Sequence, residues 1–343
     1  MSAKVISIAD STVGAGAGVV GLRPGVRRWR IWIWRVIGAL LVAVVGVVGI
    51  AWINRVEWAA WGIVSAPNRG RVISASDDPG LAELARLGVS QAFRVEVGVP
   101  RASLAVWIVE PARNSGIKPR GTILFLHGIW DRKNSQLGMA RGFAERGYRG
   151  VLVDARGHGA SSGEFLSYGV REVEDYRQLL DELERRGLLA GRLGVYGVSY
   201  GAGCAVQLAG ADARVAAVVA VAPFSSLRSE VHAYALQVLP WAEWFGDGWV
   251  GAALERAGQI GGFDPDRADG VAAVRNSAAH FLLIHGREDA KIPWRESWRL
   301  HEAGMEKSEI IVVPGEGHDS ITWDRTGVIG GESTAWFERW VGE

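Results

Sequence analysis

Short apolar runs recur along residues 91–341, separated by longer amphipathic or polar stretches. Six of them have the length of buried strands: residues 122–126, 150–153, 193–196, 215–221, 280–284 and 310–313. Residues 91–97 and 103–110 are typical of an opening pair of strands. Sequence of helical character fills several of the intervals, at 136–146, 170–186 and 202–209. Strands that alternate with helices indicate βαβ units. The pattern therefore predicts an α/β fold built on a mostly parallel, doubly wound sheet.

A different pattern occupies the N-terminal part of the chain. Residues 36–53 form an uncharged apolar run with tryptophans on both sides. As a helix the run would be roughly 27 Å long, close to the thickness of a bilayer's hydrocarbon core, and flanking tryptophans are typical of membrane interfaces. We therefore expect one transmembrane helix. The alternatives are a cleaved signal peptide, whose apolar region is usually shorter, and a buried core helix.

Charge is distributed unevenly about this run. Five arginines precede it, whereas Arg55 and Glu57 follow it. Because basic residues stay on the cytoplasmic side, we expect a single-pass protein with a cytoplasmic N-terminus and its large domain on the extracytoplasmic side. The expected organisation is a basic segment at 1–30, a membrane anchor at 31–55, a linker at 56–90 and an α/β domain at 91–343.

Composition narrows the classes of function. The formal net charge is +1 at pH 7, so overall charge gives no reason to expect nucleic-acid binding. Cysteine and histidine do not occur at metal-ligand spacings, and no metal or cofactor is expected. Cys204 is the single cysteine, which excludes an intramolecular disulfide, and we expect it to be a small buried residue.

The pattern G-x-S-x-G occurs twice, around Ser161 and around Ser199. Only Gly197 and Val198 separate Ser199 from the predicted strand at 193–196, and a helix of small residues begins directly after Ser199. That strand–turn–helix context is what a nucleophile elbow requires. Ser161 lies in a polar loop broken by glycines, where a serine usually serves turn formation. We therefore predict that Ser199 is a catalytic nucleophile.

A series of motifs in a fixed order carries a resemblance to a known superfamily. The chain resembles α/β-hydrolases over roughly residues 90–341, and more narrowly it is similar to serine aminopeptidase/monoacylglycerol lipase-like and Bem46-like serine hydrolases. The motifs are His127-Gly128, Asp154-x-Arg156-Gly157-His158-Gly159-x-Ser161, Gly197-x-Ser199-x-Gly201, His285-Gly286-x-x-Asp289-x-x-Ile292-Pro293 and Gly317-His318. In this fold the nucleophile is followed along the chain by an acid and then by a histidine.

Asp289 and His318 fit the roles of acid and base. Each lies in a loop that follows a predicted strand, at the sheet edge where open α/β sheets bind ligands. Glu288 and Asp319 are neighbouring alternatives for the acid, but the family pattern favours the carboxylate three residues after Gly286, which is Asp289. The same pattern makes His127 and His158 structural residues, whereas His285, at the end of a strand, reads as a packed core group.

Acyl transfer also needs backbone N–H donors for the developing oxyanion. One donor should be Tyr200, which follows the nucleophile. The resemblance places the second at Ile129, with Trp130 as the near alternative. A cap insertion is expected at about 224–278, whose aromatic residues either pack on the body or form an apolar wall for an acyl chain. Candidate pocket residues are Trp130, Trp241, Trp244 and Trp323.

These features predict a membrane-anchored serine hydrolase with a Ser199–Asp289–His318 triad. We expect it to cleave carboxylic esters of small or lipid-like acyl substrates through an acyl-enzyme. A peptidase or amidase with the same triad is the first alternative, because fold does not determine substrate. A membrane-tethered binding module without catalysis is the second.

Overall fold

The computed structural model describes residues 24–71, 79–111, 118–238, 248–324 and 326–342. The chain divides into two compact units, residues 1–54 and 55–343. Helix α1 (Pro24–Val64) runs through the boundary. Within Trp29–Val64 its most apolar stretch has a mean hydropathy of 2.8, and none of that stretch is buried in the protein. The helix is therefore long enough and apolar enough to cross a membrane.

The last turns of α1 belong to the second unit. Ala60 and Val64 are fully buried and pack with Ala257 of α7 (Gly248–Gly261). Glu57 forms an ion pair with Arg256, with its Oε2 2.7 Å from Nε. The segment expected to be a linker from residue 56 onward is thus helical as far as Val64. Ala60 and Val64, four residues apart, lie on one face of the helix and pack against α7.

An eight-stranded sheet forms the centre of the second unit, in the order β1-β2-β4-β3-β5-β6-β7-β8. Strands β1 and β2 pair antiparallel, as do β2 and β4, and every other neighbouring pair is parallel. The strand bounds are β1 Gln91–Val97, β2 Ala102–Val109, β3 Gly121–Leu126, β4 Arg149–Val153, β5 Arg192–Val198, β6 Val215–Val221, β7 His280–Gly286 and β8 Ser308–Val313. The predicted sheet is confirmed.

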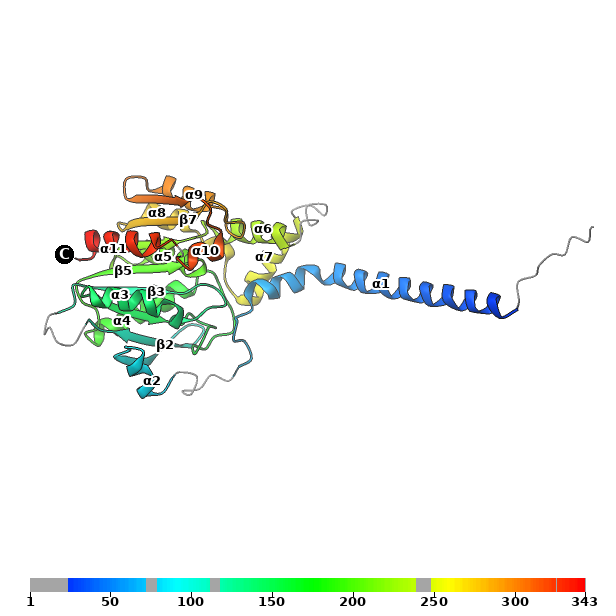
Figure 1. Cartoon of the computed structure of the whole chain (residues 1–343), viewed down its shortest axis with the longest axis horizontal. Coiled ribbons are helices and arrows are strands. Elements are labelled where there is room, and N and C mark those ends of the chain that lie inside the picture. The colour runs from blue at the N-terminus through cyan, green and yellow to red at the C-terminus, as the bar shows by residue number, and fades with distance from the viewer. Residues whose placement is uncertain (1–23, 72–78, 112–117, 239–247, 325, 343) are drawn as a thin grey trace, which may run out of the picture. The chain divides into compact units, whose positions relative to one another are not determined.

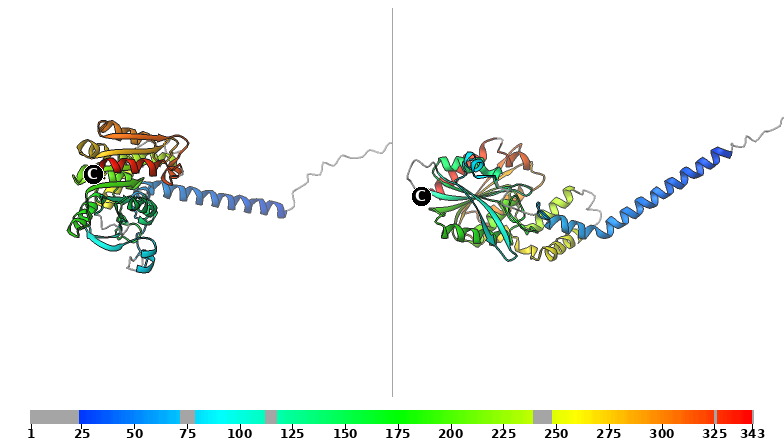
Figure 2. Two further views of the ribbon diagram at one scale, coloured as in Figure 1. Left: turned by 60° about the vertical axis from the view of Figure 1, so that its left-hand side comes forward. Right: turned by 90° about the horizontal axis from the view of Figure 1, so that it is seen from below.

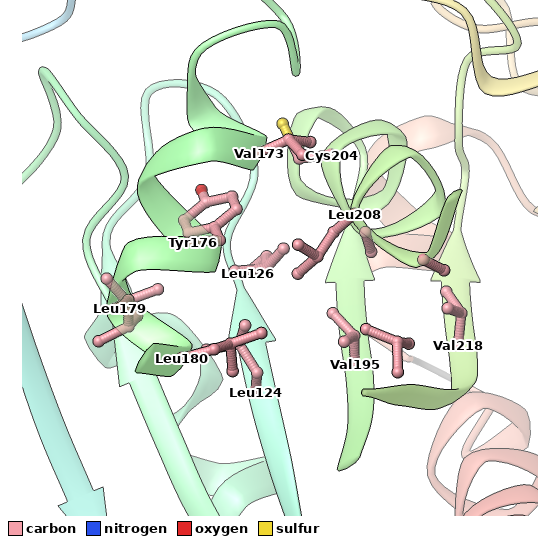
Figure 3. Close-up of a cluster of buried hydrophobic side chains, with 14 of the residues drawn as sticks. Leu124, Leu126, Val173, Tyr176, Leu179, Leu180, Val195, Cys204, Leu208 and Val218 are labelled. Atoms are coloured by element: carbon pink, nitrogen blue, oxygen red, sulfur yellow. The ribbon is translucent and has the colours of Figure 1, made fainter. Parts of the chain in front are cut away.

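Alternation along the strands supplies two hydrophobic layers. In β3, Leu124 and Leu126 face the layer formed with α4, α5, α8 and α9, whereas Ile123 and Phe125 face the layer with α2, α3, α10 and α11. Figure 3 shows the first layer between α4, α5 and the sheet, with Tyr176 and Leu208 filling it. Figures 1 and 2 show helices on both sides of the twisted sheet. The helix bounds are α2 Leu81–Arg86, α3 Leu137–Glu145, α4 Glu172–Arg185, α5 Tyr200–Ala211, α8 Gly270–Asn276, α9 Arg295–Ala303, α10 His318–Thr322 and α11 Val328–Trp340.

The expected cap insertion contains α6 (Leu227–Val238), α7, a 3₁₀ turn at Pro265–Arg267 and α8. Leu227 of α6 and Leu254 of α7 are buried together. Arg228 of α6 also forms ion pairs with Glu255 of α7 and with Asp266 of the 3₁₀ turn. A helical cap is therefore present between β6 and β7.

The burial of Ala60 and Val64 leads to a prediction about truncation. A protein starting at residue 55 should fold cooperatively, whereas one starting at residue 65 should melt about 5 °C lower, because it loses core contacts worth a few kcal/mol. Thermal unfolding followed by circular dichroism measures the difference. Equal melting temperatures would show that the end of α1 contributes nothing to the second unit.

Candidate active site

Ser199 lies at a sharp turn between β5 and α5. Its backbone has φ 52° and ψ −115°, a conformation that costs a non-glycine residue of the order of 1–3 kcal/mol. The Ser199 N–H donates to the carbonyl of Val221 in β6 at 2.8 Å, and its own carbonyl accepts from Ala202 and Gly203 in the first turn of α5. The neighbouring strand and the helix therefore hold the turn in this strained geometry.

The two glycines of the motif are required by close backbone contacts. A Cβ at Gly197 would lie 2.4 Å from the carbonyl oxygen of Gly201. A Cβ at Gly201 would lie 2.3 Å from the carbonyl oxygen of Leu126 at the end of β3. Any side chain at either position would separate α5 from the sheet and displace Ser199.

His318, at the start of α10, brings the serine and the acid together. Its Nε2 is 3.0 Å from Ser199 Oγ, and its Nδ1 is 2.7 Å from Asp289 Oδ2. Because a carboxylate oxygen only accepts, Nδ1 carries the proton, which leaves the Nε2 lone pair facing the serine hydroxyl. This is the tautomer that a general base needs. The structure thus brings together the three residues that the sequence predicts as nucleophile, base and acid.

Asp289 is fully buried and well supplied with donors. Its Oδ1 accepts from the N–H groups of Lys291 and Ile292, each at 2.9 Å. Burial raises the pKa of Asp289, but hydrogen bonds from His285 and His318 and those backbone donors outweigh it and lower the pKa to about 2. The carboxylate is therefore ionised throughout the neutral range and orients the imidazole of His318.

His285 is a second histidine beside the acid, a role that the sequence did not reveal. Its Nε2 lies 2.8 Å from the carbonyl oxygen of Ile292 and 3.4 Å from Asp289 Oδ2, while Nδ1 lies 2.7 Å from Ser297 Oγ. Facing two acceptors, Nε2 carries the proton. His285 is buried as expected, and it also fixes the position of Asp289.

Two of the alternative residues, Ser161 and Asp319, are engaged elsewhere. Ser161 is buried, where its Oγ donates to the carbonyl of Asp154 at 2.7 Å and accepts from the N–H of Ala105 at 2.8 Å. Asp319 is exposed and forms an ion pair with Lys291 at 2.6 Å. Both contacts are structural.

The segments predicted to form the oxyanion hole lie next to Ser199. Tyr200 is the first residue of α5, and a Cβ at Gly128 would lie 3.8 Å from Ser199 Cβ. Ile129, the next residue, packs against the core layer that contains Tyr200. Tyr200 N–H and Ile129 N–H remain the predicted donors, with Trp130 as the alternative.

A buried ion pair braces the loops behind this site. Lys133 Nζ is 2.7 Å from Asp154 Oδ2, and both side chains are almost completely buried. Asp154 Oδ2 also accepts from the N–H of Ala160, and His127 Nε2 accepts from the N–H of Ala155. Burial lowers the pKa of His158 to about 3 and keeps its ring neutral. The structural role expected for His127 and His158 agrees with these contacts, while Lys133 was not anticipated.

The comparisons with known proteins agree with this arrangement. A model of the family described as X-Pro dipeptidyl-peptidase (S15 family) matches residues 101–307, more than half of the chain. The chain belongs to the S15 peptidase family. The match includes Ser199 and Asp289 and ends before His318. A curated relative is the uncharacterized protein YqkD of Bacillus subtilis (strain 168), 28% identical over 215 residues, which are 60% of this chain and 67% of YqkD.

Solved structures support the same fold. The esterase Pf2001 of Pyrococcus furiosus superposes with a TM-score of 0.60 at 18% identity, over 80% of this chain and 98% of the esterase. The acylaminoacyl peptidase of Pyrococcus horikoshii superposes with a TM-score of 0.57 at 19% identity, over 76% of this chain and 43% of the peptidase. The predicted membership of the α/β-hydrolase serine hydrolases is confirmed.

The four candidate pocket residues have different outcomes. Trp241 and Trp244 lie outside the described residues. Trp130 has a left-handed φ of 63° and is 69% exposed, and Trp323, just after α10, is 82% exposed. Trp130 lies in the loop after β3, and Trp323 follows the helix that begins at His318; their contact with substrate stays a prediction.

Glu230 of α6 is a carboxyl group that the sequence analysis missed. Its Oε2 is inaccessible and has no hydrogen-bonding partner among the described residues. Burial raises the pKa of Glu230 to about 8, and the charges of Glu296 and Asp289 act in the same direction. The side chain is therefore mostly protonated at neutral pH.

This raised pKa gives a pH-dependent prediction. The unfolded state ionises near pH 4.5 and the folded state near pH 8, so the unfolded state binds fewer protons between these values. Through Glu230, the free energy of unfolding should therefore fall by up to about 1.4 kcal/mol for each unit that the pH rises across this window. Glu230→Gln should remove this contribution, most clearly between pH 6 and 8, whereas Glu306→Gln, at an exposed site, should not. Urea unfolding at pH 5, 6, 7 and 8 tests this, and parallel curves for wild type and Glu230→Gln would contradict it.

Proposed function

We propose that this protein is a membrane-anchored serine hydrolase that cleaves carboxylic ester bonds through an acyl-enzyme. The observation that carries the proposal is the continuous hydrogen-bonded series from Ser199 Oγ through His318 to Asp289. A binding module would have no use for a strained serine whose hydroxyl faces an unprotonated imidazole nitrogen. The solved structures that superpose on this chain include a protein named an esterase and one named a peptidase, and both names are compatible with this chemistry.

Ser199 Oγ attacks the acyl carbon while His318 Nε2 takes the hydroxyl proton. The N–H groups of Tyr200 and Ile129 stabilise the oxyanion, each contributing about 3 kcal/mol at the transition state. The imidazolium, held by ionised Asp289, then gives its proton to the leaving alkoxide, and the acyl group remains on Ser199. Water attacks the acyl-enzyme by the same route in reverse, releasing the acid and restoring Ser199.

Cleavage of peptide or amide bonds is the second candidate. The family model that matches the chain is described as an X-Pro dipeptidyl-peptidase. The same triad suffices, because His318 would protonate a leaving amine in place of an alkoxide.

Labelling with a fluorophosphonate tests the catalytic assignment. Folded wild type should form an adduct on Ser199, Ser199→Ala none, and Asp289→Asn should react about 10³- to 10⁴-fold more slowly because His318 loses its orienting carboxylate. Asp319→Asn is the matched control and should react at the wild-type rate. An adduct on another residue, or none in folded wild type, would overturn the proposal. The same acyl groups presented as esters and as amides, including an aminoacyl-proline pair, then separate esterase from peptidase by kcat/KM.

The anchor is proposed to be residues 31–55, with the N-terminus in the cytoplasm. The exposed apolar surface of α1 and the arginines before it support this. In intact cells or spheroplasts, a protease added outside should cut the 55–343 unit and spare a tag at residue 1. If the unit is protected until the membrane is permeabilised, the proposed orientation is wrong. If carbonate washing releases the protein from the membrane, the proposed anchor is wrong.

A further inference from the structure

A pocket of about 700 Å³ opens in the second unit and contains none of the triad residues. Its walls come from the segment after α1, the β1–β2 turn, the loop between β4 and α4, and the end of α7. Four of its lining residues are arginines, Arg71, Arg101, Arg156 and Arg171, against one carboxylate, Glu164. The lining of this pocket therefore favours an anion.

The inner arginines are fixed in place. Arg156 is buried and forms two hydrogen bonds of 2.6 Å with Asp175. Arg171 donates from Nη2 to the carbonyl of Gly262 at 2.6 Å. Burial, and then the nearby charge of Arg156, lower the pKa of Arg171, whereas the charges of Glu172 and Asp175 oppose that shift. A bound anion would give the guanidinium of Arg171, which donates to the backbone carbonyl of Gly262, a charged acceptor.

Glycines shape the wall around these groups. Gly262 has φ 65°, and a Cβ there would lie 2.8 Å from Arg171 Nη2. Gly163 has φ 134°, and a Cβ there would lie 2.9 Å from the backbone nitrogen of Gly157. Side chains at these positions would displace Arg171 or close the loop against itself. Glycine at these two positions therefore maintains the position of Arg171 and the shape of the pocket wall.

We propose that this pocket binds the phosphate group of a phosphoester. Planar guanidinium groups match phosphate oxygens in bidentate geometry, which makes arginine the preferred partner of phosphate. Asn68 to Arg71 follow the end of α1 at Val64 by only a few residues. Only 12 residues separate Asn68 from residue 55, the end of the proposed anchor, so a phospholipid headgroup is the favoured source and a soluble phosphate ester the other.

Binding to the full-length protein in a neutral maltoside detergent tests the proposal. Isothermal titration would use dihexanoyl-phosphatidylglycerol, dihexanoyl-phosphatidylcholine, glycerol 3-phosphate and inorganic phosphate at constant ionic strength. Saturable binding that falls at least 10-fold in Arg71→Gln and in Arg171→Gln is expected. Arg146→Gln, an exposed arginine on the opposite helix layer, is the control and should bind as wild type.

The ligands separate the two sources. Binding of the dihexanoyl lipids without binding of glycerol 3-phosphate identifies a headgroup site. Binding of glycerol 3-phosphate with the same affinity as the lipids identifies a site for soluble phosphoesters. Arg171→Lys keeps the charge and should lose only part of the affinity, which guards against a variant that simply misfolds. No saturable binding by any phosphate ligand, or binding unchanged in both glutamine variants, would overturn the proposal. Fluorophosphonate labelling of Ser199 should persist in all these variants, so the outcome is independent of the proposed hydrolase activity.

Discussion

The contact of the Ser199 turn with the end of β3 is the constraint on which the site depends. Gly201 lies so near the carbonyl of Leu126 that no Cβ fits between them. This contact sets how closely α5 approaches the sheet and holds Ser199 at a positive φ. The loops after β7 and β8 then need only reach the same edge of the sheet for Asp289 and His318 to meet the serine.

The rest of the fold keeps that edge rigid, largely through buried polar groups. Asp154 and Lys133 neutralise one another beneath the loop after β4. Tyr168 packs against the ring of Tyr200 and donates its hydroxyl proton to the carbonyl of Ile63, in the last turn of α1. The residue beside the nucleophile is thereby connected to the helix end that enters the second unit, which explains why that helix end belongs to the folded domain.

The sheet and the triad were predictable from sequence because both depend on local order along the chain. Buried parallel strands are continuous apolar runs, and Ser199, Asp289 and His318 each follow one. The helical ending at Val64 was missed because Arg55 and Glu57 end the uncharged run, and the apolar residues that follow gain a packing partner only when α7 lies opposite. The pairing of Lys133 with Asp154 and the isolation of Glu230 depend on contacts between distant segments, which spacing cannot reveal.

Two carboxyl groups near the cap, Asp289 and Glu230, show how donors influence charge in this region. Asp289 receives hydrogen bonds from two ring nitrogens and two backbone N–H groups and is ionised at neutral pH. Glu230 Oε2 has no donor among the described residues and keeps its proton. Since burial acts on Glu230 and Asp289 in the same direction, the hydrogen bonds and the neighbouring charges account for the opposite outcome. The negative charge is thereby placed on Asp289, where it stabilises the imidazolium of His318 during proton transfer.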